Sequence, residues 1–171
     1  MKKNIIRAVV FASACLIAFN YFPEKSIVPN VKIDKLVVLK SKRKLLAYEN
    51  GVLIKTYTIS LGINPIGAKE FEGDMKTPEG IYTINDKNPN SGYYKNLGVS
   101  YPNDHDIKHA ATLGKPTGGD IKIHGLRNGM GFLNKFQRFF DWTYGCMALT
   151  NKEVEELYQH VPIGTVIEIK P

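Results

Sequence analysis

The sequence predicts a mainly β domain with one or two helices packed on it. Residues 34–62 contain three segments rich in β-branched, aromatic and aliphatic side chains, which is typical of strands. Residues 165–170 ("TVIEIK") close the chain with the alternation of another strand, whereas the clearest helix is confined to residues 151–161. With 171 residues, of which 43% are hydrophobic, the chain is long enough to bury one core without disulfides.

The first three strands form a predicted β-meander. They are "DKLVVLK" (34–40) and the two halves of "RKLLAYENGVLIKTYTISLG" (43–62), which Asn50-Gly51 joins because both residues tolerate the positive φ of a type I′ hairpin. The basic run "KSKRK" (40–44) is interpreted as a solvated turn and hairpin edge, where lysines discourage edge-to-edge pairing. No aromatic or glycine pattern of a nucleic-acid reader accompanies the run, so nucleic acid is not an expected partner.

The middle of the chain is less periodic. Residues 63–80 are rich in Gly, Pro and charge, which predicts a long ordered loop of the kind that often carries function, followed by the strand "IYTIND". Turn signals dominate residues 88–119, where short strands and loops are expected. In "DIKIHG" (120–125), alternation places His124 at a strand end, on the face opposite Ile121 and Ile123.

The predicted helix has a well-defined start. Thr150 is a good N-cap, and Glu153 three residues later completes a capping box. Leu149 and Val154 are spaced for a hydrophobic staple. Pro162 follows the helix and marks its end.

Residues 1–22 form a separate N-terminal segment, predicted to be a signal peptide or a membrane anchor. Its basic start is followed by the apolar run "AVVFASACLIAFNYF", which can contact a membrane. Either "ASA" (12–14) is a cleavage site or the whole segment remains as an anchor. Lipid attachment at Cys15 is less favoured, because apolar "LIAF" follows it. Residues 23–30 are the expected linker and residues 31–171 the expected folded domain, exported to the periplasm or cell envelope.

The charge of the expected domain is modest. The whole chain has 23 basic and 16 acidic residues, a formal charge of +7, and Lys2, Lys3 and Arg7 belong to the N-terminal segment. The remaining 20 basic and 16 acidic residues leave about +4, which suits an anionic cell-envelope surface without requiring one. No cofactor motif is visible, and none is expected.

Cys146 is the only cysteine outside the N-terminal segment, and in an exported protein a free thiol is an oxidation liability that selects for pairing, removal or use. An imidazole is the usual means of making a thiolate near neutral pH, and His124 is the natural partner. Gly145 would let a substrate carbonyl approach, and backbone N–H groups of residues 144–146 can form an oxyanion hole. The alternative is that Cys146 is a small buried hydrophobe.

"IHGL" followed by "TYGCMALTN" resembles the His-Gly and [Ser/Thr]-x-Gly-Cys-x-x-x-x-Asn signature of the L,D-transpeptidase (YkuD) family, and the likeness extends from residue 34 through "GDMKTPEGIYTI" to the end. The resemblance implies a β-sandwich-like catalytic fold that acts on peptidoglycan stem peptides. It further implies Cys146 as nucleophile and His124 as proton donor and acceptor. The supporting or oxyanion-hole residues that it implies are Thr143, Tyr144, Gly145 and Gly125, with Asn151 completing the motif.

Two departures from the family pattern leave the reaction direction open. Tyr144 and Ala148 stand where many members have His or Arg, and the 21 residues between His124 and Cys146 are a long interval. Both features resemble the YafK-type branch, some of whose members cut links between peptidoglycan and protein. The predicted activity is therefore transfer through a thioester to an amine, which includes attachment of a wall protein, and the alternative is hydrolysis.

The long interval supplies candidate substrate-binding residues. Arg127 and Arg138 can hold substrate carboxylates bidentately, although each alone is as readily explained as solvated charge. Trp142 is interpreted as a core or pocket-wall residue, the alternative being a specific sugar platform. The second ring nitrogen of His124 needs a partner, for which a backbone carbonyl and Asp141 are the candidates.

Two other functions compete with this hypothesis. A zinc peptidase could use His105, His109 and His124, but "YPNDHDIKHA" lacks both a helical apolar stripe and the Glu of an HExxH arrangement, so no metal is expected. A non-catalytic envelope-binding domain would keep the scaffold with an inert thiol at Cys146.

Overall fold

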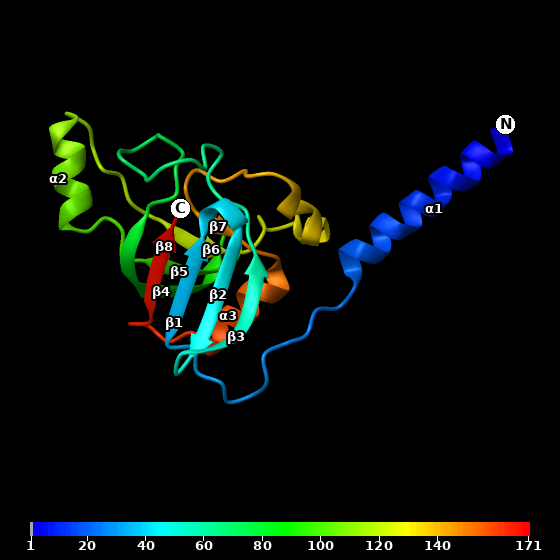
Figure 1. The fold of residues 1–171 in the computed structure, drawn as a ribbon, viewed down its shortest axis with the longest axis horizontal. Helices are drawn as coiled ribbons and strands as arrows, with labels where there is room; N and C mark the ends of the chain where they lie inside the picture. The colour runs from blue at the N-terminus through cyan, green and yellow to red at the C-terminus, as the bar shows by residue number, and fades with distance from the viewer. Residues whose placement is uncertain (1) are drawn as a thin grey trace.

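The computed structural model describes residues 2–171 and contains one eight-stranded sheet in the order β3-β2-β1-β8-β4-β5-β6-β7. The sheet curls around its own core (Figure 1), which confirms the mainly β class. The strands are β1 (Lys35–Leu39), β2 (Lys44–Glu49), β3 (Val52–Thr58), β4 (Gly80–Ser91), β5 (Tyr94–Val99), β6 (Lys122–His124), β7 (Met147–Ala148) and β8 (Val166–Lys170). The helices are α1 (Lys2–Tyr21), α2 (Asp104–Thr112) and α3 (Asn151–His160), with 3-10 segments η1 (Lys40–Lys42) and η2 (Gly131–Phe139).

The opening meander is confirmed. β1 and β2 pair antiparallel, as do β2 and β3, and Glu49 pairs with Val52 across the turn. Asn50 and Gly51 have φ values of 50° and 78°, the positive pair that a type I′ turn requires. β8 pairs parallel with β1 and antiparallel with β4, so the last strand of the chain joins the two halves of the sheet.

The second half of the sheet positions the motif residues. β6 pairs antiparallel with β5 and parallel with β7. The chain after β3 bridges to this half, because Ser60 and Ala148 exchange backbone hydrogen bonds of 3.0 and 2.9 Å, and Gly62 pairs with Thr143. These bridges bring the two ends of the sheet together beside Cys146. The curled sheet encloses a core to which β1, β2, β4, β5, β6 and β8 all contribute, including Leu36, Leu45, Ile84, Leu97, Ile123 and Ile167.

α3 follows the sequence prediction residue by residue. Thr150 is the N-cap, and its hydroxyl accepts a hydrogen bond from the Glu153 N–H while the Glu153 carboxylate accepts one from the Thr150 N–H. Val154 and Leu157 are fully buried in the core. This helix therefore fixes the chain that leaves the Cys146 loop.

α2 lies in a region expected to contain only short strands and loops. A capping box starts it, with the Asn103 side chain accepting from the N–H groups of His105 and Asp106. Of its nine residues only Asp106 and Ala110 are buried. The helix shows no apolar stripe because it packs little, so periodicity could not reveal it.

The basic run at residues 40–44 forms the predicted turn between β1 and β2, with Lys42 exposed, but its first residue is not solvated. Lys40 is only 2% exposed, and its ammonium donates to the Gly67 and Thr77 carbonyls and to Glu79. Buried ammonium groups need such partners, and here the partners belong to the long loop between β3 and β4. Lys40 thus fastens that loop to the meander.

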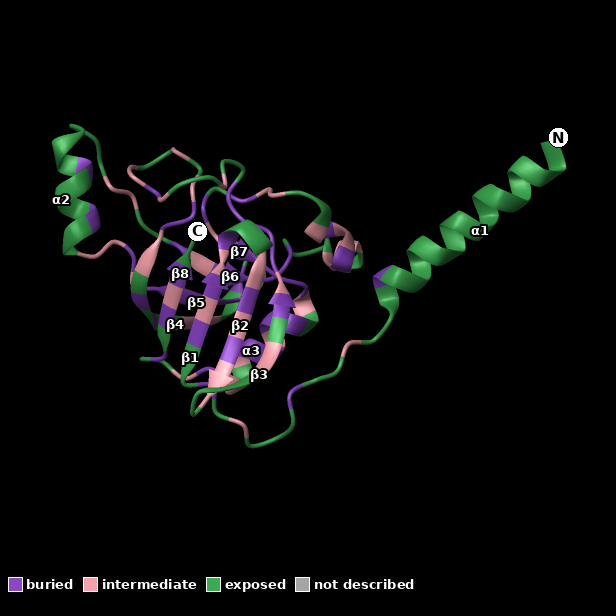
Figure 2. Ribbon diagram, in the orientation of Figure 1, coloured by how far each residue is buried: buried purple, intermediate pink, exposed green. Residues whose placement is uncertain are grey.

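α1 projects from the domain (Figure 1) and is exposed along its length except at its C-terminal end (Figure 2). By length and composition it could cross a membrane, with a mean hydropathy of 1.5. The segment predicted as a linker packs on the domain instead of hanging free, since Ile27 joins the core and its N–H donates to Glu156. The role of residues 1–22 as a cleaved signal peptide or a retained membrane anchor stays a prediction.

Candidate active site

The sheet register brings Cys146 towards His124, because Cys146 immediately precedes β7, the strand that pairs with β6. Ile123 pairs with Met147 and His124 with Ala148 in the parallel pair β6–β7. Cys146 precedes Ala148 by two residues, so continued strand alternation would give its side chain the orientation of those of Ala148 and His124. Neighbouring strands lie about 4.8 Å apart and two residues rise about 6.6 Å, so we expect the Cα atoms of His124 and Cys146 to lie about 8 Å apart, a span that two side chains can bridge.

A backbone carbonyl holds the imidazole of His124. Its Nδ1 lies 2.7 Å from the Gly125 oxygen. A carbonyl oxygen only accepts, so Nδ1 carries a proton and Nε2 of the neutral ring remains an acceptor. Of the two candidate partners this is the backbone carbonyl, whereas Asp141 accepts from Arg43 and from the Leu61 N–H.

Two aromatic rings enclose the imidazole. The Tyr93 ring centroid lies 4.8 Å from that of His124, and the Trp142 centroid lies 5.7 Å away at an interplanar angle of 76°. Burial lowers the pKa of His124; the Gly125 hydrogen bond raises it and the charge of Lys122 lowers it further. The ring is therefore neutral near pH 7 and can accept a proton. No sequence spacing indicated Tyr93, which the turn between β4 and β5 brings here.

The thiol of Cys146 contacts a different backbone carbonyl from the one that holds His124. Its Sγ lies 3.5 Å from the Asp120 carbonyl, to which it donates. Burial raises the pKa of the thiol, and the N–H and charge of Lys122 offset this in part. The raised pKa of the thiol and the lowered pKa of the imidazole make both groups neutral near pH 7.

The turn that carries Cys146 is fastened by Thr143. Its hydroxyl donates to the Cys146 carbonyl at 2.7 Å and accepts from the Gly145 N–H at 3.2 Å. Gly145 has a φ of 126°, and a Cβ there would lie 2.6 Å from the Lys76 carbonyl. Glycine is therefore required for backbone packing against the long loop, a reason separate from the predicted approach of a substrate carbonyl.

The hydrogen bonds of this turn leave only some of its N–H groups available as oxyanion-hole donors. The Gly145 N–H is already used by Thr143, whereas within residues 2–171 no hydrogen bond uses the N–H of Tyr144 or Cys146. Gly125 supports the site differently, because its carbonyl orients His124 and its N–H donates to the Tyr93 and Lys95 carbonyls. Tyr144 has a 75% exposed side chain beside Cys146.

Asn151, the last residue of the motif, supports the chain after His124. Its Oδ1 accepts from the Leu126 N–H at 2.8 Å. A Cβ on Gly125 would lie 2.8 Å from the same oxygen, and a Cβ on Gly131 would lie 3.0 Å from Asn151 Nδ2. Asn151 thus holds Leu126 to the start of α3 by a hydrogen bond, and Gly125 and Gly131 pack closely against its amide.

The loop between β3 and β4 packs against the turn that carries Cys146, and hydrogen bonds within the loop hold its conformation. The nearly buried Asp74 carboxylate accepts from the N–H groups of Glu70, Phe71 and Lys76 and pairs with Lys69 at 2.7 Å. Burial raises the pKa of Asp74, but Lys69 and the three N–H groups outweigh burial and lower it overall. The expected ordered loop is therefore present, and its Lys76 carbonyl lies against Gly145.

The predicted substrate-binding residues separate into two groups. Trp142 and Arg127 line one cavity of about 370 Å³, together with Tyr93, Leu126, Met130, Leu133, Gln137 and Phe140. Arg138 lies outside it, because its guanidinium is 11% exposed and pairs with Glu24 at 2.9 Å and Glu153 at 2.7 Å. The prediction that Arg138 holds substrate carboxylates is corrected, because each of its two terminal nitrogens already binds a protein carboxylate.

The histidines of the zinc hypothesis do not meet. His105 and His109 stack on α2, whereas His124 belongs to β6. Among residues 2–171 no three His, Cys, Asp or Glu side chains are grouped so as to hold a metal ion.

Comparisons with known proteins agree with this fold and motif. The model of the YkuD family, the L,D-transpeptidase catalytic domain, matches residues 33–169. YafK of Escherichia coli strain K12, an L,D-transpeptidase by name, is 30% identical over 130 residues, which are 72% of this chain and 45% of YafK.

Two solved structures place the fold. The helical cell shape determining protein Pgp2 of Campylobacter jejuni gives a TM-score of 0.59 at 27% identity, covering 86% of this chain and 52% of Pgp2. An L,D-transpeptidase of Xylanimonas cellulosilytica gives 0.52 at 15% identity, covering 86% of this chain and 65% of that one, a likeness of fold alone.

The fold and motif thus define an L,D-transpeptidase-type domain. The chain belongs to the YkuD family of L,D-transpeptidase catalytic domains, and its resemblance to YafK is confirmed. It spans about half the length of YafK and of Pgp2.

Proposed function

We propose that this chain is a peptidoglycan L,D-transpeptidase in which Cys146 forms a thioester with a stem peptide and His124 moves the proton. The observation that carries the proposal is the pairing of β6, which ends at His124, with β7, which begins directly after Cys146, together with the engagement of His124 Nδ1 by Gly125, which leaves Nε2 as the acceptor. Membership of the YkuD family supports the substrate class. The name of Pgp2 as a cell-shape protein supports a role in shaping the wall.

In the first half-reaction, Cys146 Sγ attacks the carbonyl carbon before the terminal D-amino acid of a tetrapeptide stem. His124 Nε2 accepts the thiol proton as the S–C bond forms. The C–N bond then breaks, and the leaving amine takes the proton from Nε2. The free N–H groups of Tyr144 and Cys146 are the donors available to the tetrahedral oxyanion, and one such donor contributes about 3 to 4 kcal/mol in enzymes where it has been removed.

In the second half-reaction, an amine attacks the thioester carbonyl and His124 accepts its proton. The new C–N bond forms, the C–S bond breaks, and the sulfur of Cys146 recovers the proton. Water in place of the amine completes a hydrolysis by the same steps. A second stem peptide and a wall-attached protein are the proposed acceptors.

We place the reaction in the cell envelope. Lys2, Lys3 and Arg7 lie in the first two turns of α1, the apolar helix that could cross a membrane, an arrangement that keeps the basic end in the cytoplasm and the domain outside. The expected domain of residues 31–171 would then meet peptidoglycan.

The test is to incubate the full chain in detergent micelles with tetrapeptide muropeptides, with and without an amine acceptor, and to identify products by mass spectrometry. Transfer predicts cross-linked dimers or exchange of the terminal D-amino acid, and release of that amino acid alone indicates hydrolysis. Cys146→Ala and His124→Ala should each abolish product, whereas Cys15→Ala, which removes the other thiol, should not. Wild-type turnover by Cys146→Ala, or activity lost to a chelator, would refute the proposal.

A further inference from the structure

The end of α1 is built into the domain through one buried amide. Asn20 is 1% exposed, although the rest of α1 is exposed along its length (Figure 2). Its Oδ1 accepts from the N–H groups of Lys135 at 2.9 Å and Phe136 at 3.3 Å, and its Nδ2 donates to the Phe132 carbonyl. The Asn20 side chain therefore binds backbone groups of η2, which lies more than 110 residues later in the sequence.

The need for this amide follows from a break inside η2. Asn134 has φ 42° and ψ −117°, so η2 consists of two short turns joined at this residue. The first N–H groups of a helical turn have no partner within the turn, and those of Lys135 and Phe136 would be unpaired after the break. Asn20 satisfies both, which makes it the cap of the second turn.

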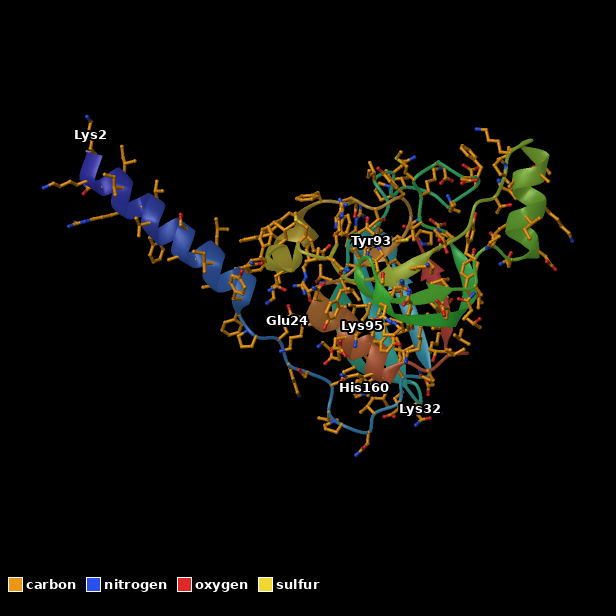
Figure 3. All side chains as sticks on the ribbon, turned by 180° about the vertical axis from the view of Figure 1, so that it is seen from behind. Lys2, Glu24, Lys32, Tyr93, Lys95 and His160 are labelled. Carbon is orange, nitrogen blue, oxygen red and sulfur yellow. The ribbon has the colours of Figure 1, made fainter. Side chains whose placement is uncertain are left out.

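Ion pairs around the Asn20 amide strengthen the junction between the end of α1 and the domain. Glu24, which lies where the chain leaves α1 and meets the domain (Figure 3), pairs with Arg138 at 2.9 Å and with Lys135 at 3.2 Å. Lys135 also donates to the Phe22 carbonyl at 2.7 Å. Arg138 in turn pairs with Glu153 in the first turn of α3. The junction thus joins α1, η2 and α3.

The second turn of η2 is connected to the His124 imidazole through the side chains of Gln137 and Trp142. Gln137 is 2% exposed, and its Oε1 accepts from Trp142 Nε1 at 3.0 Å and from the Ser60 hydroxyl at 2.8 Å. Trp142 then packs edge-on against His124. One chain of contacts therefore runs from Asn20 through residues 135–137 and Trp142 to His124.

We propose that the end of α1 is a positioning element of the active site, in which Asn20 caps the second turn of η2 and so fixes Gln137 and Trp142 against His124. The functional chain must then keep Asn20. Cleavage after Ala14 would leave this residue in place, whereas cleavage after Phe22 would remove it. The catalytic part of this inference rests on the proposed function, but the structural part does not.

Trp142 is the only tryptophan of the chain, so fluorescence excited selectively at tryptophan reports on the His124 end of this chain of contacts. In the full chain in detergent micelles, Asn20→Ala should increase acrylamide quenching of Trp142. Asn4→Ala, the same change at the far, exposed end of α1, should leave quenching unchanged. Asn20→Asp keeps the accepting oxygens and should restore most of the wild-type protection. Equal quenching of Asn20→Ala and wild type, or equal defects in both Asn20 variants, would overturn the capping role.

Activity supplies the second measurement. Misplacement of a reacting group by about 1 Å can cost about 100-fold in rate, so Asn20→Ala should lower kcat by about 10- to 100-fold. Asn4→Ala should retain wild-type kcat. If Asn20→Ala loses its far-UV circular dichroism, Glu24→Gln replaces it as a milder variant and should raise Trp142 quenching in the same direction; no rise would overturn the proposal. A folded chain that shows the fluorescence change but no Cys146-dependent turnover would contradict the proposed function and leave the junction standing.

Discussion

At the scale of single residues, the site depends on opposite effects of burial on two titratable groups. Burial lowers the pKa of His124 and raises that of Cys146, so both are neutral near pH 7. The imidazole can then take the thiol proton during attack instead of before it. The site therefore differs from one that stores a thiolate–imidazolium pair.

This assignment predicts the acid limb of the pH–rate profile. Activity needs neutral His124, so kcat/KM should fall as pH drops through the pKa of this residue, which lies below its ordinary value of 6.5. Stopped assays of stem-peptide turnover between pH 4 and pH 9 measure the limb. A limb above pH 6.5 would show that the folded protein stabilises the imidazolium, contrary to the effect of burial.

Gly145 gives a second prediction at this scale. Gly145→Ala would combine a strained φ of 126° with a clash against the Lys76 carbonyl, and should lower the free energy of unfolding by about 1 to 3 kcal/mol. Gly51→Ala is the matched control, because its φ of 78° is strained but no atom lies within 4 Å of the added Cβ. It should cost about 1 kcal/mol in chemical denaturation. Equal losses would show that the Lys76 contact is unimportant.

At the scale of elements, α3 is the part that sequence alone defines best. Its start rests on local chemistry, the reciprocal hydrogen bonds between Thr150 and Glu153, which a spacing of three residues encodes. The Asn50-Gly51 hairpin is defined in the same local way. Such elements are predictable because their cause lies within a few residues.

Thr150 can be tested directly. Thr150→Ala removes the side-chain cap and should lower the free energy of unfolding by about 1 kcal/mol, whereas Thr150→Ser keeps the hydroxyl and should cost much less. Urea denaturation of the two variants beside wild type measures the difference. Equal stability of the Ala and Ser variants would refute the capping contribution.

Other elements depend on distant residues and were not predictable. α2 carries too few buried residues for a periodic signal, and Lys40 is buried by a loop that arrives 27 to 39 residues later. At the candidate site, the motif identified His124, Cys146 and Thr143 with their neighbours. Tyr93 and Gln137 have no spacing that points to the site, because only the curl of the sheet and the turns of η2 bring them there.

At the scale of the whole molecule, the N-terminal segment and the catalytic fold form one connected structure. Glu24 is the charged centre of that connection, and its surroundings have opposing effects. Burial raises its pKa, but the hydrogen bonds and charges of Arg138 and Lys135 outweigh burial and lower it to about 2. Folding therefore favours the ionised carboxylate.

The lowered pKa of Glu24 determines the direction in which the stability of the fold changes with pH. A carboxyl whose pKa falls from 4.5 to about 2 on folding stabilises the fold above pH 4.5 and loses that contribution as pH falls towards 2. The difference in thermal midpoint between wild type and Glu24→Gln should thus shrink from pH 5 to pH 2. A constant difference across that range would mean that the Glu24 charge does not hold the N-terminal segment.

The central claim is that Cys146 carries the acyl group of the stem peptide. The most direct measurement is the mass of the acid-quenched full chain after incubation with a tetrapeptide stem without an amine acceptor, followed by peptide mapping. We expect an added mass equal to the stem less its terminal D-amino acid, located on Cys146, present in Cys15→Ala and absent in Cys146→Ala. Turnover of the stem with no adduct on Cys146, undiminished in Cys146→Ala, would contradict it.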